Sequence, residues 1–177
     1  MDLIFETQRL LLKPILESDL STLHSILINP YVRNYLCDDQ ILSLQQVEQM
    51  LMESQKLFNE QKFGLWLIET KNQQEIIGFV ALWYFFDEKQ PQLVYALLPE
   101  ATKKGYATEA ATKILEYCFN SLGYQYILAS CDRPNVDSTK VAQRIGMKQV
   151  EEKLVNDKPV LFLKIEESNK IMEDCIK

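Results

Sequence analysis

The sequence predicts an α/β (α+β) fold of about seven strands and about four helices. Two observations favour this class. Strand-like apolar stretches alternate along the chain with segments of helical spacing, and 47% of the 177 residues are hydrophobic, whereas only 5 are glycine and 6 are proline. That composition is typical of a folded globular protein. Since ordinary domains hold about 100 to 200 residues, we expect residues 1–177 to form one domain.

The first half of the chain predicts one strand, two helices and a hairpin. Apolar alternation over residues 5–16 predicts the strand. A helix follows, with Ser18 and Asp19 as its cap and Asn29-Pro30 as its end, and a second helix begins at Ser43. We expect these two helices to cover one edge of the sheet. The stretches FGLWLIET and EIIGFVALWYFF, joined by KNQQ, predict the hairpin.

The second half of the chain predicts two longer αβ units and a terminal hairpin. A strand at 93–98 leads into PEATKKGYATEAATKILEYCFNSLG, in which Gly105 precedes a long helix that ends near Gly123. A buried strand at 126–131 precedes a short helix that Gly146 stops. Two further strands, at 148–155 and 160–165, are joined by NDKP. The last ten residues predict either a short helix or an ordered tail.

The charge of the protein disfavours nucleic acid as a partner. The formal net charge is −6 with a pI near 4.9, and Lys and Arg are scattered along the sequence. Binding to nucleic acid requires clustered cations that displace counterions. An acidic surface suits a substrate that carries an amine, but most acidic proteins are acidic only for solubility.

Cysteine and histidine usage argues against a metal site, and the apolar runs argue against a membrane span. The four cysteines lack CxxC or CxxH spacing, and the opening MDLIFETQRL has no signal-peptide pattern, so we expect a cytoplasmic protein with reduced thiols. The longest apolar run, IIGFVALWYFF, is shorter than the about 20 residues of a membrane span. The single histidine, His24, is interpreted as a structural or surface residue, and no metal is predicted.

The segment 99–111 combines a strand end, a basic loop and a helix N-terminus. The first turn of a helix leaves about four N–H groups without internal partners, and its dipole favours a nearby anion. Gly105 would let the chain approach a phosphate, and Lys103 and Lys104 add positive charge. The segment matches neither the P-loop pattern nor GxGxxG. Taken alone, it is equally consistent with a solvated loop.

Four segments, taken together, resemble one protein family. LVYALLPEATKKGYATEAATKIL resembles the acyl-CoA-binding motif of the GCN5-related N-acetyltransferase (GNAT) superfamily, especially its RimJ/RimL-like ribosomal-protein acetyltransferase branch. ETQRLLLKP, EIIGFVAL and NVDSTKVAQRIGM resemble further segments of that branch, in the same order. The resemblance implies a GNAT fold. In that fold a mixed, V-shaped central sheet has its fourth and fifth strands, here 93–98 and 126–131, splayed apart to admit the pantetheine arm of acetyl-CoA.

The resemblance also implies a set of cofactor contacts. The pyrophosphate of acetyl-CoA would rest on the backbone amides of residues 104–108, and N–H groups of the fourth strand would polarise the thioester carbonyl. The family has Gln, Arg or Trp where Thr102 stands, and often Gly where Lys103 stands. The implied cofactor-binding residues are Leu97, Leu98, Thr102, Lys103, Lys104, Gly105, Tyr106, Ala107, Thr108, Asn135 and Ser138.

Ser138 and Tyr95 are the catalytic candidates. Ser138 matches a residue that in relatives lies near the thioester sulfur, or it is an exposed residue of a first helical turn. Tyr95 would hold a water or the acceptor amine through its hydroxyl, or it is a buried core residue. Asn135 would contact the pantetheine, cap a helix, or do both. Asp38 and Asp39 either face the incoming amine or form a solvated turn.

The resemblance implies an N-acetyltransferase that moves the acetyl group of acetyl-CoA to a primary amine, either a protein N-terminus or a small molecule. We expect direct attack by the amine in a ternary complex, because no base adjoins Cys131 to make it a nucleophile. The alternative is a non-catalytic acyl-CoA-binding regulatory module, since no carboxylate base stands out. A phosphate-binding protein unrelated to CoA is a third interpretation. The sequence leaves the acceptor open, and also whether the protein is a monomer or a homodimer.

Overall fold

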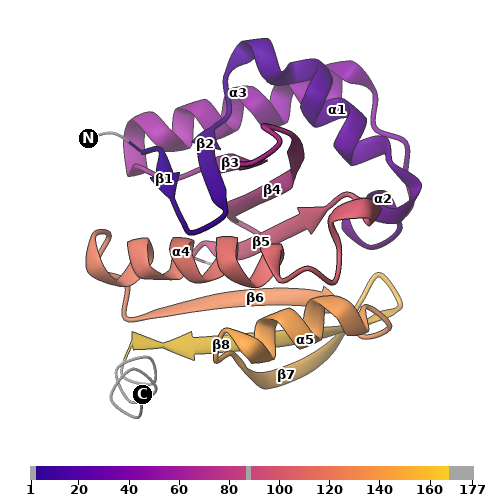
Figure 1. The fold of residues 1–177 in the computed structure, drawn as a ribbon. Helices are drawn as coiled ribbons and strands as arrows, with labels where there is room; N and C mark the ends of the chain where they lie inside the picture. Colours follow the sequence, from indigo (N-terminus) through magenta and orange to yellow (C-terminus); the bar gives the residue numbers. More distant parts are fainter. Residues whose placement is uncertain (1–2, 87–88, 168–177) are drawn as a thin grey trace.

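The computed structural model describes residues 3–86 and 89–167 and has one sheet with helices on both faces (Figure 1). The strands are β1 (Phe5–Glu6), β2 (Leu10–Pro14), β3 (Leu65–Thr70), β4 (Ile76–Trp83), β5 (Gln92–Leu97), β6 (Tyr126–Asp132), β7 (Lys148–Val155) and β8 (Lys158–Glu166). The helices are α1 (Leu20–Ile28), α2 (Pro30–Leu36), α3 (Leu44–Gln61), α4 (Tyr106–Asn120) and α5 (Val136–Arg144), with 3-10 turns at Glu17–Asp19 and Pro99–Ala101. The expected C-terminal segment lies outside the described residues, as do 87–88 of the expected loop after the hairpin.

The sheet is mixed, as predicted, and it divides at one point. Its strand order is β1-β2-β3-β4-β5-β6-β8-β7, and all neighbours are antiparallel except β5 and β6. These two parallel strands pair only at Gln92 and Leu128 and then separate. The divergence is the V shape that the family resemblance implied between 93–98 and 126–131.

The N-terminal strand and the first helix each differ from the expectation. The predicted strand over residues 5–16 is broken into β1 and β2, because the backbone N–H and the hydroxyl of Thr7 both bond to the carbonyl of Leu10 in a tight turn. Asn29-Pro30 ends α1 and also starts α2, which the sequence did not predict. Proline is compatible with the first helical turn, and the Asn29 side chain accepts from the N–H of Tyr31. The described residues therefore form eight strands and five α-helices.

Two apolar clusters occupy the two faces of the sheet. Side chains alternate along a strand, so Leu65 and Leu67 of β3 join one cluster and Trp66 and Ile68 join the other. Helices α1, α2 and the first half of α3 pack on the first face, and α4 packs on the second (Figure 1). The first helices thus cover a face of the sheet, where the sequence had suggested an edge.

Candidate active site

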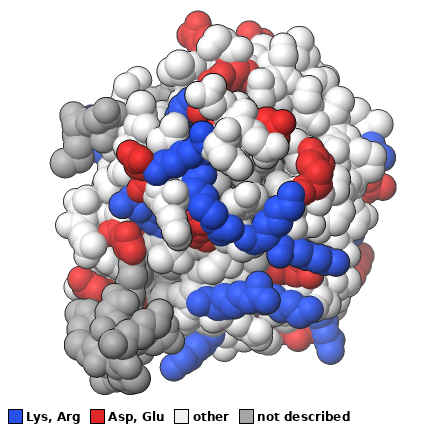
Figure 2. All heavy atoms as spheres, in the orientation of Figure 1, with Lys and Arg blue, Asp and Glu red and all other residues white. Residues whose placement is uncertain are grey.

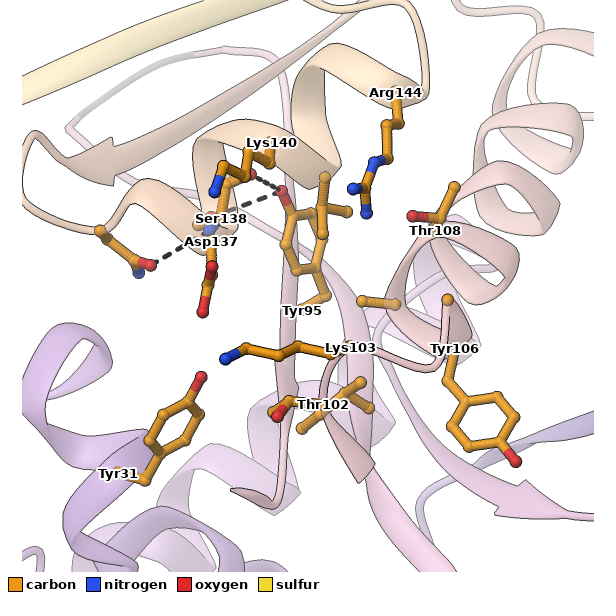
Figure 3. Close-up of a pocket in the computed structure, with 15 residues that line it drawn as sticks. Tyr31, Tyr95, Thr102, Lys103, Tyr106, Thr108, Asp137, Ser138, Lys140 and Arg144 are labelled. Atoms are coloured by element: carbon orange, nitrogen blue, oxygen red, sulfur yellow. Dashed lines mark hydrogen bonds between the residues drawn. The ribbon is translucent and has the colours of Figure 1, made fainter. Parts of the chain in front are cut away.

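A cavity of about 360 Å³ opens where β5 and β6 separate, between the start of α4 and one side of α5 (Figure 3). Its volume falls in the range of small-molecule sites. Most residues of the predicted cofactor set line it, together with five that the sequence analysis missed. The lining residues are Tyr31, Tyr95, Leu97, Thr102, Lys103, Gly105, Tyr106, Ala107, Thr108, Asn135, Asp137, Ser138, Lys140, Val141 and Arg144.

The N-terminus of α4 presents unpaired polar groups to this cavity. Gly105 is the N-cap, with φ of 82°, and no side chain caps the helix, so the first N–H groups have no intrahelical acceptors. The hydroxyl oxygen of Thr108 is buried and has no hydrogen-bond partner within the described part of the chain, and Figure 3 shows it directed into the cavity. Together with the helix dipole, these donors form a site for an anion.

Cations surround the same cavity although the protein is acidic overall. Lys103 from the loop and Lys140 and Arg144 from α5 line it, and Figure 2 shows Lys and Arg gathered on this face. Residues 140 and 144 are one helical turn apart and therefore share a face of α5. These cations are scattered along the sequence, and the fold brings them together at the cavity.

Tyr95 and Ser138 are joined by hydrogen bonds at the wall between β5 and α5 (Figure 3), and Asn135 is bonded to Ser138. The Tyr95 hydroxyl donates to the carbonyl of Ser138 at 2.8 Å, and the Ser138 hydroxyl lies 3.4 Å from the Tyr95 oxygen. Asn135 caps α5 by accepting from the N–H of Ser138 at 3.1 Å. Burial raises the pKa of Tyr95 to about 12, so this phenol is protonated at neutral pH.

Comparison with known proteins identifies the family. A family model for the acetyltransferase (GNAT) domain matches residues 9–148, which is more than half of the chain. The chain belongs to the GNAT acetyltransferase family. It is similar to the uncharacterized N-acetyltransferase YoaA of Bacillus subtilis, with 26% identity over 147 residues that cover 82% of this chain and 83% of that protein.

Solved structures of GNAT proteins share the fold of this domain. A ribosomal-protein-S5-alanine acetyltransferase from Vibrio fischeri matches with a TM-score of 0.76 and 18% identity, covering 94% of this chain and 97% of that one. Spermidine N-acetyltransferase from Vibrio cholerae, in complex with CoA and spermine, matches with a TM-score of 0.77 and 18% identity, covering 93% and 99%. At these identities the likeness is one of fold.

In this GNAT domain the edge of β5 that faces the divergence has backbone groups available. The N–H of Leu98 donates to Ile77 of β4, and N–H groups alternate in direction along a strand. Those of Tyr95 and Leu97 therefore point toward the gap beside β6. Leu98 and Lys104 belong to the predicted contact set but do not line the cavity. The side chain of Leu98 packs on the opposite face, and the carbonyl of Lys104 accepts from Arg9.

Hydrogen bonds and an ion pair between Arg9 and Glu109 connect the β1–β2 turn to the start of α4. The Glu109 carboxylate accepts from the Thr7 hydroxyl, from the Arg9 backbone N–H and from Arg9 Nε, at 2.7 to 2.8 Å. Arg9 also donates to the carbonyl of Lys104 at 2.9 Å, and its guanidinium lies 4.5 Å from the centre of the Tyr106 ring. Burial raises the pKa of Glu109, but the bonds from Thr7 and Arg9 outweigh it, so the pKa is lowered overall.

Lys103 adopts an unusual backbone conformation in the loop before α4. Its φ is 60°, in the left-handed region that favours glycine. This geometry gives a physical reason why glycine is frequent at this position in the resembled motif. Here a lysine takes the same conformation, and its side chain extends across the cavity toward Tyr31 (Figure 3).

Cys131 lies on β6 near the divergence but is not activated. Its sulfur is 3.5 Å from the Thr139 hydroxyl. Burial raises the pKa of the thiol, and the charge of Asp132 raises it further, so the thiol is protonated at neutral pH. Within the described part of the chain, Cys37, Cys118 and Cys131 form no disulfide.

The same described residues contain no group of three side chains that could hold a metal ion. None of their helices is long and apolar enough to cross a membrane.

Asp38 and Asp39 lie away from the cofactor cavity, in the loop that follows α2. Asp38 pairs with Lys158 at 2.7 Å, and Asp39 pairs with Arg33 at 3.0 Å. Both residues are exposed and have positive φ, which fits the solvated turn that was one of the two interpretations. Asp38 also lines a second cavity on the opposite face of β5.

Proposed function

We propose that this GNAT domain transfers the acetyl group of acetyl-CoA to a primary amine by direct attack within a ternary complex. One observation carries the proposal. A helix N-terminus with an unpartnered Thr108 hydroxyl adjoins a strand edge whose N–H groups face an open gap. The first feature suits a phosphate and the second suits an acyl carbonyl, so a molecule carrying both groups fits the cavity.

Cofactor binding rests on the N-terminal turn of α4 and on the surrounding cations. The backbone N–H groups of Gly105, Tyr106, Ala107 and Thr108 would hold the pyrophosphate, and the Thr108 hydroxyl would add one donor. Lys103, Lys140 and Arg144 would neutralise phosphate charge. Thr102 and Asn135 also line the cavity and complete the proposed contact set.

The chemistry requires a neutral amine, a polarised thioester and a stabilised thiolate. The nitrogen–carbon bond forms as the carbon–sulfur bond breaks, and the proton lost by the amine balances the proton gained by the CoA thiolate. We assign the N–H groups of Tyr95 and Leu97 to the carbonyl oxygen. We assign the Ser138 hydroxyl to the departing sulfur, with Tyr95 holding the Ser138 carbonyl in place at 2.8 Å. Because Tyr95 is protonated, its hydroxyl acts as a donor.

We further propose membership of the RimJ/RimL-like branch. Support comes from the four sequence segments and from the shared fold with the Vibrio fischeri ribosomal-protein acetyltransferase. Because the Vibrio cholerae spermidine enzyme has the same fold, the branch does not fix the acceptor. The alternative is a regulatory module that binds acyl-CoA without turnover.

The test is release of free CoA thiol from acetyl-CoA with and without a panel of primary amines, on the full chain. We expect amine-dependent release, and double-reciprocal plots that intersect because both substrates must be bound before reaction. A regulatory module would instead show a rise in Tm on adding acetyl-CoA with no thiol release for any amine.

A further inference from the structure

A second cavity, of about 300 Å³, lies on the face of β5 opposite the cofactor cavity. Val94 lines the second cavity and Tyr95 lines the first. Neighbouring side chains of a strand point to opposite faces, so one strand separates the two cavities, and both adjoin the segment of β5 that has left β6. A group in the second cavity is therefore within one strand's thickness of the proposed thioester position.

The walls of the second cavity are mostly apolar. They come from α1, α2, the loop after it and α3, and from β3, β4, β5 and the residues that follow β4; Gln40 of the loop is an uncharged polar residue among them. The side chains that define them include Leu36, Leu42, Phe79, Trp83, Phe85 and Val94. Among the lining residues, Asp38 is the one that carries a formal charge. Such a surface stabilises an apolar group by about 25 cal/mol per Å² removed from water.

Two carboxylates lie close to each other beside this cavity. Asp38 lines it, and Asp132, whose charge interacts with that of Asp38, ends the part of β6 that has separated from β5. Lys158 pairs with Asp38 at 2.7 Å, and its charge also reaches Asp132. Burial is the main cause of a raised pKa of Asp132, which the charge of Asp38 raises further and that of Lys158 lowers. Lys158 thus compensates one of the two carboxylates, Asp38 and Asp132. The remaining negative charge can be compensated by one ammonium group of a bound amine.

We infer that the second cavity receives the acceptor, and that the acceptor is a small monoamine bearing an aromatic or branched apolar group. The apolar group would occupy the cavity, and the amino group would lie toward Asp132 and the divergence of β5 and β6. This inference rests on the proposed acetyl transfer and specifies its acceptor.

Polycationic acceptors fit this cavity less well. A polyamine or an aminoglycoside carries several positive charges along its length, and each needs a carboxylate or water once it is desolvated. The lining offers one carboxylate, Asp38, with Asp132 nearby, and Lys158 already compensates one of these two charges. A peptide N-terminus would bring several backbone amides into a lining where few side chains can hydrogen-bond them, chiefly Gln40, Asp38 and the Trp83 indole N–H.

The first experiment compares four amines as substrates of the full chain with saturating acetyl-CoA. The amines are 2-phenylethylamine, spermidine, kanamycin and a hexapeptide with a free N-terminus, and the readout is release of CoA thiol. We expect kcat/KM for 2-phenylethylamine to exceed each of the others by at least about tenfold, or about 1.4 kcal/mol in transition-state binding.

Substitutions then locate the site. Val94→Phe fills the cavity, and Trp83→Ala removes one wall at a half-buried position where folding is less at risk. Each should lower kcat/KM for 2-phenylethylamine by about tenfold while acetyl-CoA still raises the Tm as in the wild type. Met52→Ala, at a side chain 62% exposed on α3, serves as the control and should change neither quantity.

The outcomes separate this inference from the proposed function. Faster turnover of spermidine, kanamycin or the peptide would overturn the monoamine inference and leave acetyl transfer standing. Unchanged turnover of 2-phenylethylamine in both cavity variants would place the acceptor elsewhere and overturn it as well. Failure of all four amines, with acetyl-CoA still bound, would contradict both the inference and the proposed function.

Discussion

The cofactor cavity and the second cavity lie on opposite faces of β5 and are of similar volume, but different chemical groups line them. The first uses backbone N–H groups, the Thr108 hydroxyl and cationic side chains. The second uses apolar side chains that the first helices bring against β4 and β5. Under the proposed function, a strand that leaves its neighbour would serve two reactants, because alternation directs successive side chains to different chemical environments.

The largest effect on this contrast is expected from Gly105→Val. The φ of 82° is costly for any β-branched residue, by about 1 to 2 kcal/mol, and the added Cβ would lie 3.3 Å from Arg9 Nη2. We expect acetyl-CoA affinity to fall at least about tenfold, measured as loss of the Tm increase on adding acetyl-CoA.

Gly123→Val is the matched control for that change. Gly123 has a similar φ of 70°, and a Cβ there would meet nothing within 4 Å. The variant should lose a comparable amount of stability but keep the affinity for acetyl-CoA. If acetyl-CoA raises the Tm of Gly105→Val as much as that of the wild type, the α4 loop does not bind the cofactor.

Glu109→Gln tests the cofactor side of this comparison, through the pH dependence of the unfolding free energy. The variant loses the charge that holds Arg9, at a cost of about 1 to 3 kcal/mol of unfolding free energy at pH 7. Since the folded pKa of Glu109 lies below its ordinary value, the stabilisation is complete above the unfolded pKa of about 4.3. It disappears as pH falls through the folded value.

Urea denaturation at several pH values measures this difference. The gap in unfolding free energy between wild type and Glu109→Gln should narrow as pH falls below about 4. We also expect a higher KM for acetyl-CoA, because Arg9 holds the carbonyl of Lys104, with the KM of the amine unchanged. A gap that stays constant with pH would show that the carboxylate charge is not the cause.

Ser138→Ala tests the boundary between binding and chemistry. A hydroxyl that acts on the departing sulfur helps mainly as negative charge develops, so kcat should fall by about tenfold while the Kd for acetyl-CoA changes by less than about twofold. Ser25→Ala, on an exposed part of α1, should alter neither. A loss of binding alone would make Ser138 a cofactor contact, and no change in either would leave it a structural residue.

Cys131→Ala has the smallest expected effect. Because burial keeps this thiol protonated, we expect at least about a tenth of the wild-type activity to remain, a loss of under about 1.4 kcal/mol in barrier. The measurements are steady-state kinetics and incubation with labelled acetyl-CoA without amine. Parallel double-reciprocal lines, or label retained on Cys131, would indicate a covalent intermediate.

The cofactor loop was more predictable from sequence than the second cavity, for a physical reason. Gly105 and Lys103 stand beside the start of α4, so local spacing suggested an anion site, and the family resemblance decided between that site and a solvated loop. The second cavity joins segments far apart in sequence, and residues such as Leu42 and Val94 show in the sequence only as apolar residues. No local signal distinguishes a cavity wall from a filled core.

Other differences between the predicted and the observed elements arose where one residue is compatible with two structural roles. Asn29-Pro30 was interpreted as an end because proline stops a helix, and its equal suitability for a first turn concealed α2. Tyr31, which lines the cofactor cavity, was missed with that helix. Arg144 could have been found from its spacing to Lys140, had the segment been considered as one face of a helix.

The single backbone pair between Gln92 and Leu128 also has a mechanical consequence. The strands β1–β5 and β6–β8 form two plates, and this pair is the point at which hydrogen bonds of the sheet cross between them. Side chains of α4 pack in the one cluster that includes residues from both plates. The resistance of β1–β5 and β6–β8 to twisting against each other therefore depends more on side-chain packing than on backbone hydrogen bonds. A molecule hydrogen-bonded to the free edge of β5 would add a second connection between them, so the sheet would be stiffer in the complex than in the protein alone.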